Sequence, residues 1–257
     1  MRFVIFSGTT EGRQLSRALA DRGAAVQVCV ATAYGREQQG QYPGVQVHTG
    51  RMEPPAMAAL LAGAALCIDA THPYAAAATA NIRAAAAAAG VSCRRLLRAP
   101  SPLPENAWCV PDAAAAAARL ADTAGNILLA TGAKELPAFA PLDPQRLYPR
   151  VLPQAENLAA CAAAGIPAGH IIAMQGPFGA ELNRALIHQF AIRYLVTKDG
   201  GAAGGFAEKV QAAADTGIQL VVIRRPPDAG ESCEAVLAAC EALLAQNEKK
   251  GGEGTCR

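Results

Sequence analysis

Short apolar runs alternate with helical stretches along nearly the whole chain, and this alternation restricts the fold more than any other feature of the sequence. The runs at residues 2–8 (RFVIFSG) and 65–71 (ALCIDAT) are apolar at nearly every position. Strands of this kind are buried on both faces, as they are in a parallel sheet that helices cover on both sides. The pattern therefore predicts an α/β protein with parallel sheets flanked by helices.

The boundaries of the predicted elements follow from the apolar runs and from the turn residues between them. The predicted strands cover residues 2–8, 26–32, 45–48, 65–71, 91–97, 126–131, 146–152, 170–176, 193–198 and 218–225. The predicted helices cover residues 10–22, 54–62, 74–89, 112–122, 155–164, 180–190, 203–215 and 231–246. Three prolines in residues 99–106 (APSPLPEN) interrupt the alternation, and they predict a linker.

Two α/β domains are expected on either side of this linker. Residues 1–98 form the predicted nucleotide-binding domain, and residues 107–246 form a second domain that completes the substrate site. The active site is expected in the cleft between the two domains. Residues 247–257 are expected to be a flexible tail.

Composition excludes several other classes of protein. With 52% hydrophobic residues and a net charge of +2 among 257 residues, the chain is neither disordered nor basic enough to indicate nucleic-acid binding. It lacks a long apolar segment, and its N-terminus turns polar after six residues, so we expect a cytoplasmic protein without a membrane span. The eight cysteines contain no CxxC pair, and the four histidines are scattered, so no metal site is expected. The oligomeric state stays open.

The first candidate site is the glycine-containing turn between the first strand and the first helix. It consists of Gly8, Thr9, Thr10, Glu11 and Gly12. Glycine lets a ligand approach the backbone, and the free amides at a helix start favour a phosphate. An ordinary turn with a threonine N-cap is the alternative, but its place after the first strand favours nucleotide binding.

The end of the second predicted strand bears on the choice of cofactor. NAD-specific sites often carry an acidic residue there, whereas this chain has Thr32 and, four residues later, Arg36. A hydroxyl and an arginine suit a 2′-phosphate, which favours NADPH over NADH. The alternative is that Arg36 is a solvated loop residue.

The second candidate site follows the strand at residues 65–71. His72 and Tyr74 come directly after it, and ligands of open α/β sheets bind at the carboxyl ends of strands. Two alternatives are that His72 is structural and that Pro73 begins the next helix at its first position.

Three polar loops follow strands in the second half of the chain, at residues 131–134, 174–178 and 197–201. A parallel arrangement brings such loops to one edge of a sheet. Lys198 and Asp199 are adjacent and are expected to form a charge pair that positions a proton or anchors a carboxylate. For each loop taken singly, turn chemistry is the alternative.

These segments, in this order, resemble the precorrin-6A reductase family of cobalamin biosynthesis, which includes the cobalt-precorrin-6A reductases. The matching stretches are FSGTTEGRQL, IDATHPYAA, LLATGAKEL, IIAMQGPFGAELN, YLVTKDGGAAGGFAEKV and VVIRRP. Together they cover almost the whole chain, and the DATHPYA, MQGPF and TKD segments are the most specific. One departure is Gly200, where the family commonly has serine.

The resemblance implies a two-domain, Rossmann-like oxidoreductase that reduces a double bond of a methylated, ring-contracted tetrapyrrole. NADPH or NADH supplies hydride to C19, and a proton is added at C18. The cofactor-binding residues would then be Gly8, Thr9, Thr10, Glu11, Gly12, Thr32, Arg36, His72 and Pro73. The substrate-binding residues would be Lys134, Gln175, Gly176, Pro177, Phe178 and Gly201.

The catalytic candidates are Lys198, Asp199 and Tyr74, and the proton donor stays open between Lys198, Tyr74 and water. The resemblance also implies a substrate with many peripheral carboxylates, which basic residues would bind, such as Lys134, Arg150, Lys198, Arg224 and Arg225. Two other functions stay open: a non-catalytic dinucleotide-binding module, and another Rossmann-type enzyme such as a small-molecule reductase or a tetrapyrrole methyltransferase.

Overall fold

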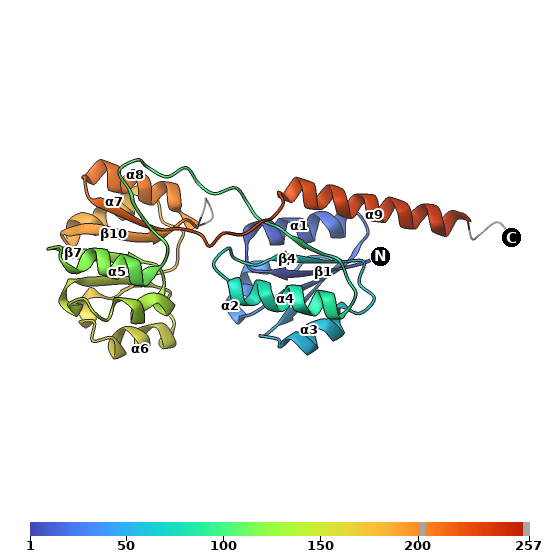
Figure 1. The fold of residues 1–257 in the computed structure, drawn as a ribbon, viewed down its shortest axis with the longest axis horizontal. Coiled ribbons are helices and arrows are strands. Elements are labelled where there is room, and N and C mark those ends of the chain that lie inside the picture. The colour runs from blue at the N-terminus through green and yellow to red at the C-terminus, as the bar shows by residue number, and fades with distance from the viewer. Residues whose placement is uncertain (201–203, 254–257) are drawn as a thin grey trace. The chain divides into compact units, whose positions relative to one another are not determined.

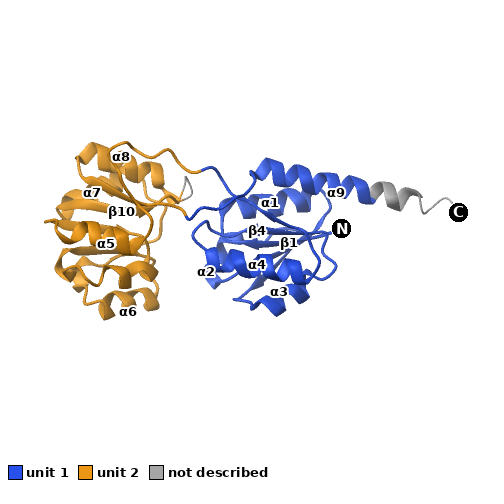
Figure 2. Cartoon of the chain, in the orientation of Figure 1, with its two compact units in different colours: residues 1–99, 226–257 blue, residues 100–225 orange. Residues whose placement is uncertain are grey.

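The structure is a computed structural model that describes residues 1–200 and 204–253, except for the side chains of residues 248–253. The chain forms two compact units (Figure 2). Unit 1 comprises residues 1–99 and 226–257, and unit 2 comprises residues 100–225. The chain therefore passes from one unit to the other twice.

Unit 1 is built on a parallel sheet with the strand order β3-β2-β1-β4-β5. Its strands are β1 (Arg2–Ser7), β2 (Ala25–Val30), β3 (Val45–Thr49), β4 (Leu66–Ala70) and β5 (Cys93–Arg95). Its helices are α1 (Thr10–Asp21), α2 (Ala33–Gln39), α3 (Pro54–Leu61), α4 (Ala76–Ala88) and α9 (Cys233–Glu253). Figure 1 shows the strands β1 and β4 between helices α1 and α4.

Alternate residues of β1 face the two sides of this sheet, as the pleat requires. Phe3 and Ile5 pack in a core with residues of α1 and α9. Val4 and Phe6 pack on the other side with residues of α3 and α4. All four side chains are buried, which explains why the strand is apolar at successive positions.

Unit 2 is built on a parallel sheet with the strand order β6-β11-β10-β7-β8-β9. Its strands are β6 (Trp108–Val110), β7 (Asn126–Ala130), β8 (Leu147–Val151), β9 (Ile172–Ala173), β10 (Ile192–Lys198) and β11 (Gln219–Ile223). Its α-helices are α5 (Ala113–Ala121), α6 (Ala155–Ala163), α7 (Ala180–Gln189) and α8 (Phe206–Thr216). Three 3₁₀ helices, η1 (Ala133–Phe139), η2 (Pro144–Arg146) and η3 (Ala168–His170), complete its described elements. The fold is therefore the predicted α/β class, with two helix-flanked parallel sheets.

The last helix corrects the expected domain of residues 107–246. After β11 the chain returns to unit 1, where Glu231 forms a parallel bridge with Leu96. Val236 and Cys240 of α9 are then buried in the same core as α1. The helix also runs to Glu253, into the segment expected to be a tail, whereas residues 254–257 lie outside the described residues.

Besides the 3₁₀ helices, one α-helix and one strand were absent from the sequence prediction. Residues 33–39 form α2, and residues 108–110 form β6, which pairs with β11. Both are short, and neither has enough apolar residues in a row to show a period.

Candidate active site

The strand order of unit 1 places two of the predicted loops together. Neighbours β1 and β4 lie where the strand order reverses, and ligands of open α/β sheets bind at this point, outside the carboxyl ends of the strands. The loop after β1 holds residues 8–9, and the loop after β4 holds residues 71–75.

A threonine side chain joins these two loops. Thr9 caps α1 by accepting a hydrogen bond from the Gly12 amide at 3.2 Å, and its hydroxyl donates to the Ala70 carbonyl at 3.0 Å. Thr9 therefore has the N-cap role that was the alternative to nucleotide binding, but it also fixes the loop against β4. The amides of Thr10 and Glu11 precede the first hydrogen bonds of α1, so they have no acceptor within the helix. An anion is favoured at such a helix start.

Gly12 permits the close approach of α1 to the sheet. A Cβ atom at this position would lie 2.7 Å from Ser7 Oγ and 2.8 Å from the Ala70 Cβ. At Gly8 the nearest atoms would be the His72 amide nitrogen at 3.7 Å and a Cα at 3.8 Å, which is ordinary contact. Gly12 is thus required for packing, whereas a side chain at Gly8 is sterically permitted.

The carboxylate of Glu11 lies beside the amides that begin α1, where it would repel a phosphate. Arg98 pairs with it at 3.1 Å, and both side chains are largely buried. The ion pair offsets this negative charge. In the structure, Glu11 therefore forms an ion pair with Arg98 within unit 1.

Residues 72–75 form a turn, closed by a hydrogen bond from the Ala75 amide to the His72 carbonyl at 2.8 Å. The His72 and Tyr74 rings stack with their centroids 5.5 Å apart, and Pro73 is buried. Because α4 begins only at Ala76, Pro73 is not its first residue, contrary to one alternative from the sequence. The backbone of His72 lies beside the loop that follows β1, because its amide nitrogen would be 3.7 Å from a Cβ at Gly8.

A buried ion-pair network that the sequence did not predict supports the loop after β4. Arg95 donates to Asp69 Oδ1 at 3.0 Å, to the Thr71 carbonyl at 2.9 Å and to Asp228 Oδ2 at 2.8 Å. Asp69 and Arg95 are both almost fully buried. The network fixes the start of the loop to β5 and to the returning segment of the chain.

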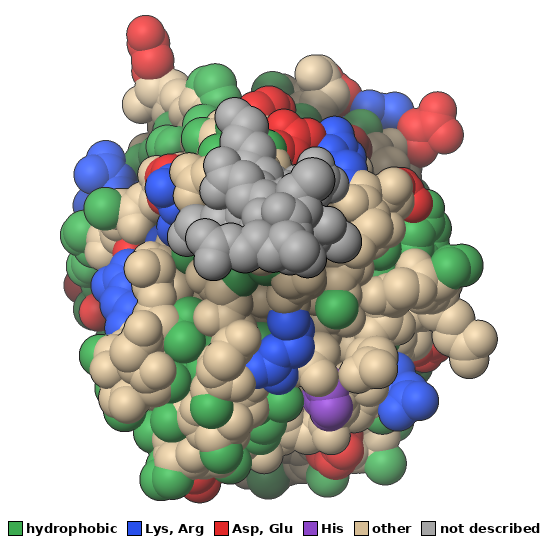
Figure 3. Space-filling model, turned by 90° about the vertical axis from the view of Figure 1, so that its right-hand side faces the viewer, with side chains coloured by type: hydrophobic (Ala, Val, Ile, Leu, Met, Phe, Trp, Pro, Cys, Tyr) green, Lys and Arg blue, Asp and Glu red, His purple; other side chains and the backbone are tan. Residues whose placement is uncertain are grey.

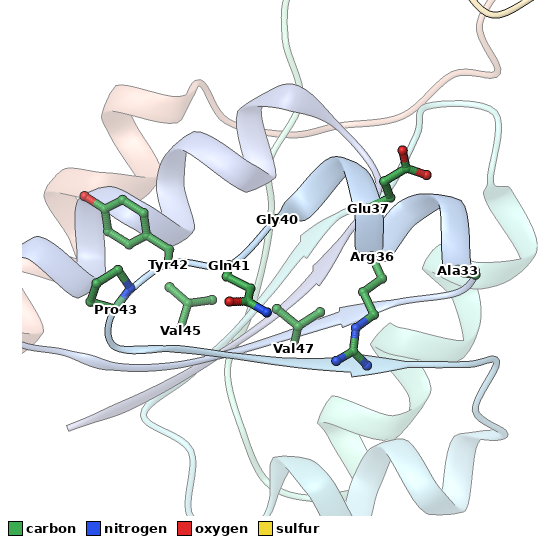
Figure 4. Close-up of a pocket in the computed structure, with 9 residues that line it drawn as sticks. All are labelled: Ala33, Arg36, Glu37, Gly40, Gln41, Tyr42, Pro43, Val45 and Val47. Carbon is green, nitrogen blue, oxygen red and sulfur yellow. The ribbon is translucent and has the colours of Figure 1, made fainter.

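Thr32 and Arg36 lie on the other side of β1, because β2 and β4 flank that strand. Thr32 caps α2 by accepting from the Gly35 amide at 3.0 Å. Arg36 is an exposed helix residue and not a loop residue. Its side chain reaches from α2 toward β3 across an open pocket (Figure 4). This pocket is lined by Ala33, Arg36, Glu37, Gly40, Gln41, Tyr42, Pro43, Val45 and Val47.

In unit 2 the strand order reverses between β7 and β10, so the loops after these strands are neighbours. Lys198, at the end of β10, forms an ion pair with Glu135 of η1. Lys134 is exposed on the same 3₁₀ helix. Thr131, directly after β7, has a buried hydroxyl with no hydrogen-bond partner among the described residues. Polar groups therefore gather at this point of the second sheet.

The expected charge pair of Lys198 with Asp199 is replaced by two pairs with other residues. Asp199 is buried and pairs with Arg225 at 3.0 Å, while one of its carboxylate oxygens accepts from the Ser101 amide at 3.1 Å. Ser101 lies near the start of unit 2, and Arg225 is its last residue. Lys198 is the last residue of β10 and Asp199 is the first residue after it, and the two side chains reach different partners.

The loop after β9 carries four of the predicted substrate residues. Gln175 and Pro177 are exposed, and the peptide bond between Gly176 and Pro177 is cis. The ring of Phe178 lies under the guanidinium of Arg150, 4.4 Å from the ring centroid. The predicted residue Gly201 lies outside the described residues.

Comparison with known proteins identifies the family. The family model described as precorrin-6x reductase CbiJ/CobK matches residues 2–243. This chain belongs to the precorrin-6x reductase family. It is 38% identical to the cobalt-precorrin-6A reductase of Salmonella typhimurium over 232 residues, which cover 87% of each chain.

Two further similar proteins are a relative whose name does not include cobalt and a protein of solved structure. The precorrin-6A reductase of Rhodobacter capsulatus is 30% identical over 227 residues, covering 88% of each chain. The structure of CobK precorrin-6A reductase superposes with a TM-score of 0.75 at 27% identity, covering 94% of this chain and 97% of that one. The predicted resemblance is therefore confirmed, and the chain belongs to a family of oxidoreductases.

The stretches that resemble the precorrin-6x reductase family share one structural position. Each runs through the carboxyl end of a strand: β1, β4, β7, β9, β10 or β11. Backbone loops and polar side chains at these ends thus carry the sequence signal, as expected for a site on parallel sheets.

None of the helices in the described part of the chain is long and apolar enough to cross a membrane. No group of three potential metal ligands occurs among the described residues. On the face shown in Figure 3, basic and acidic side chains are interspersed among apolar ones.

No role was predicted from the sequence for the buried polar residues that support these loops. These are Asp69 and Arg95 in unit 1, and Asn183 and Lys209 in unit 2. In the sequence, Asn183 stands out only as the last residue of the stretch IIAMQGPFGAELN. Its burial as a polar residue inside α7 is the structural signal of its role.

Proposed function

We propose that this chain reduces precorrin-6A or its cobalt form to the corresponding 6B product, with NADPH or NADH as the hydride source. C19 of the macrocycle gains the hydride, C18 gains a proton, and the nicotinamide is oxidised. The single observation that carries the proposal is the arrangement of the loops after β1 and β4, on a chain that belongs to this reductase family.

Unit 1 fits a dinucleotide. The amides of Thr10 and Glu11 begin α1, Gly8 leaves room for a ligand beside the backbone, and Arg98 offsets the charge of Glu11. We assign residues 8–12, His72 and Pro73 to the cofactor site. A bound nicotinamide supplies hydride, and the protein's part is to hold it and to exclude competing reactions.

NADPH is the preferred cofactor in this proposal. Thr32 uses its hydroxyl oxygen to cap α2, so Arg36 is the residue that we assign to a 2′-phosphate. Its exposed guanidinium beside an open pocket supports this assignment. Glu37 lines the same pocket and favours the hydroxyl of NADH, so the Arg36→Ala variant should lose its preference for NADPH.

We assign macrocycle binding to unit 2, through Lys134, Gln175, Gly176, Pro177, Phe178 and Gly201. Among the catalytic candidates, Asp199 has both carboxylate oxygens engaged by Arg225 and Ser101, so we assign it to positioning. The Lys198 side chain lies in an ion pair with Glu135 at the point where the second sheet reverses its order, which makes it the preferred donor to C18.

A competition between cofactors and substrates tests the proposal. Purified protein is mixed with NADPH or NADH and with precorrin-6A or its cobalt form, and nicotinamide oxidation is followed by absorbance. Oxidation is expected only when a macrocycle is present, and deuterium from labelled NADPH should appear at C19. Binding of NADPH without oxidation with either macrocycle would contradict the proposal and favour a non-catalytic module.

The proton donor is tested by comparing Lys198→Met with Tyr74→Phe. Removal of a general acid lowers kcat by about 10²–10⁴-fold, and we expect this for Lys198→Met while NADPH affinity is unchanged. If only Tyr74→Phe lowers kcat, the assignment of Lys198 is wrong.

A further inference from the structure

Unit 2 contains a buried arginine that has no acidic partner. Arg150, the fourth residue of β8, is only 7% exposed. Its Nη1 donates to Asn183 Oδ1 at 2.7 Å, and its Cζ lies 4.4 Å from the centroid of the Phe178 ring, a cation–π contact. No carboxylate lies within ion-pair distance of it among the residues that the structure describes.

Asn183 holds this arginine and the loop after β9 in one arrangement. Its side chain is fully buried, and its amide nitrogen donates to the carbonyl oxygens of Phe178 and Gly179 at 3.4 and 3.0 Å. The amide oxygen is then oriented toward Arg150. The bond to Asn183 uses Nη1 and leaves the edge formed by Nε and Nη2 without an acceptor in the described part of unit 2.

A second buried cation lies nearby. Lys209 of α8 is 8% exposed, and its Nζ donates to the Gly204 carbonyl at 2.5 Å. Burial, together with the positive charge of Arg150, lowers the pKa of Lys209 to about 8 against the opposing effect of Glu208. The start of α8 lies against the same loop as Arg150, because a Cβ at Gly205 would be 3.5 Å from the carbonyl oxygen of Phe178.

Glu208 is the acidic group that acts on Lys209, and one carboxylate does not neutralise both cations. Its Oε2 is buried without a hydrogen-bond partner, and it lies 3.6 Å from where a Cβ of Gly205 would be, at the start of α8. Two positive charges against one negative charge leave a net charge of +1 in a buried region. Buried charge of this kind is unfavourable unless an anion completes it.

We infer that Arg150 and Lys209 bind one peripheral carboxylate of the macrocycle, with Asn183 as the positioning residue. This inference rests on the proposed function, because it takes the macrocycle as the source of the carboxylate. A guanidinium edge matches the two oxygens of a carboxylate, and an ammonium adds a point charge. A phosphate of the dinucleotide has the same chemistry, but residues 8–12 in unit 1 already offer it a helix start.

The first experiment compares Arg150→Gln with Arg184→Gln. Arg184 lies on α7 in a partly exposed ion pair with Asp215, which makes it a matched control. Binding of precorrin-6A is titrated by absorbance without cofactor, NADPH binding is titrated separately, and KM and kcat are then measured. Arg150→Gln should weaken macrocycle binding and raise KM at least 10-fold, with NADPH affinity within twofold of wild type. Arg184→Gln should change neither affinity.

A double-mutant cycle locates the contact on the ligand. Each substrate derivative has one carboxylate converted to its amide. One derivative should bind wild type at least 10-fold more weakly than the parent does, and this penalty should disappear in Arg150→Gln. Arg150→Lys retains a positive charge, so its penalty for binding this amide derivative should lie between those of wild type and Arg150→Gln.

Three outcomes would overturn the inference. They are weaker binding of NADPH but not of the macrocycle, equal effects of Arg150→Gln and Arg184→Gln, or an amide penalty that persists in Arg150→Gln. If Arg150→Gln does not fold, judged by circular dichroism, the same cycle with Lys209→Gln decides. Macrocycle binding without any nicotinamide oxidation by wild type would refute the proposed function and leave this inference to the titrations.

Discussion

Gly12 shows how a single missing side chain sets the distance between a helix and a sheet. The sequence pointed to a ligand as the reason for this glycine, whereas the structure gives a packing reason, because a Cβ would collide with Ser7 and Ala70. The two reasons are compatible, since close packing also brings the start of α1 to the carboxyl end of β1.

We expect Gly12→Ala to lower the free energy of unfolding by about 1–3 kcal/mol, as overpacking does. Gly8→Ala is the matched control, because its Cβ would make only ordinary contacts, and its stability should remain close to that of wild type. Denaturant titration measures both. Equal stabilities of the two variants would show that α1 can shift without penalty.

At the scale of elements, side chains at helix starts decide how the loops are held. Thr9, Thr32 and Asp112 each cap a helix by accepting from the amide three residues later. Thr9 alone among these three also donates to a neighbouring strand, through the Ala70 carbonyl. It therefore couples the start of α1 to the end of β4.

Thr9→Ala should lower the free energy of unfolding by about 1 kcal/mol, the usual effect of losing an N-cap. It should also weaken NADPH binding, because the loop loses its bond to β4. Asp112→Ala removes the cap of α5 in unit 2 and should reduce stability similarly without affecting NADPH. Calorimetric titration and thermal melting separate the two effects. Unchanged NADPH affinity in Thr9→Ala would argue against this loop as the cofactor site.

At the scale of the whole molecule, the chain returns to unit 1 after completing unit 2. The returning segment carries Asp228, which accepts from Arg95 and Arg83 at 2.8 and 2.9 Å. Burial raises the pKa of Asp228, but these hydrogen bonds outweigh burial, so the pKa is lowered from its ordinary value of 3.8.

This lowered pKa gives a pH dependence of defined sign. A carboxyl group with a lower pKa in the folded state stabilises the fold above its ordinary value, and the stabilisation is lost as the pH falls through the folded-state pKa. The stability difference between wild type and Asp228→Asn should thus be constant above about pH 5 and shrink below pH 4. Denaturant titration at several pH values checks this. A difference that stays constant down to pH 2 would show that the ion pairs contribute nothing.

The return of the chain also predicts which pieces fold. Residues 1–99 lack α9, whose Val236 and Cys240 complete the core on the α1 face, so this fragment should not unfold cooperatively. Joining residue 99 to residue 226 through a short glycine-rich linker should restore a cooperative transition. Thermal melting followed by circular dichroism distinguishes the two. Cooperative unfolding of residues 1–99 alone would show that α9 is dispensable.

The sequence by itself determined the α/β class, the family, and most strands and helices of the fold. It did so because a strand buried on both faces must be apolar throughout, and because loops at strand ends carry polar residues. The short elements α2 and β6 left no such pattern.

Only the tertiary structure decided the partners of the charged residues and the unit to which α9 belongs. Lys198 pairs with Glu135 and Asp199 with Arg225 because of which strands lie side by side, and the order of strands does not follow the order of the sequence. Arg150 likewise had the appearance of one basic residue among many. Its burial without an acidic partner arises from packing between β8 and α7, and no local pattern records that packing.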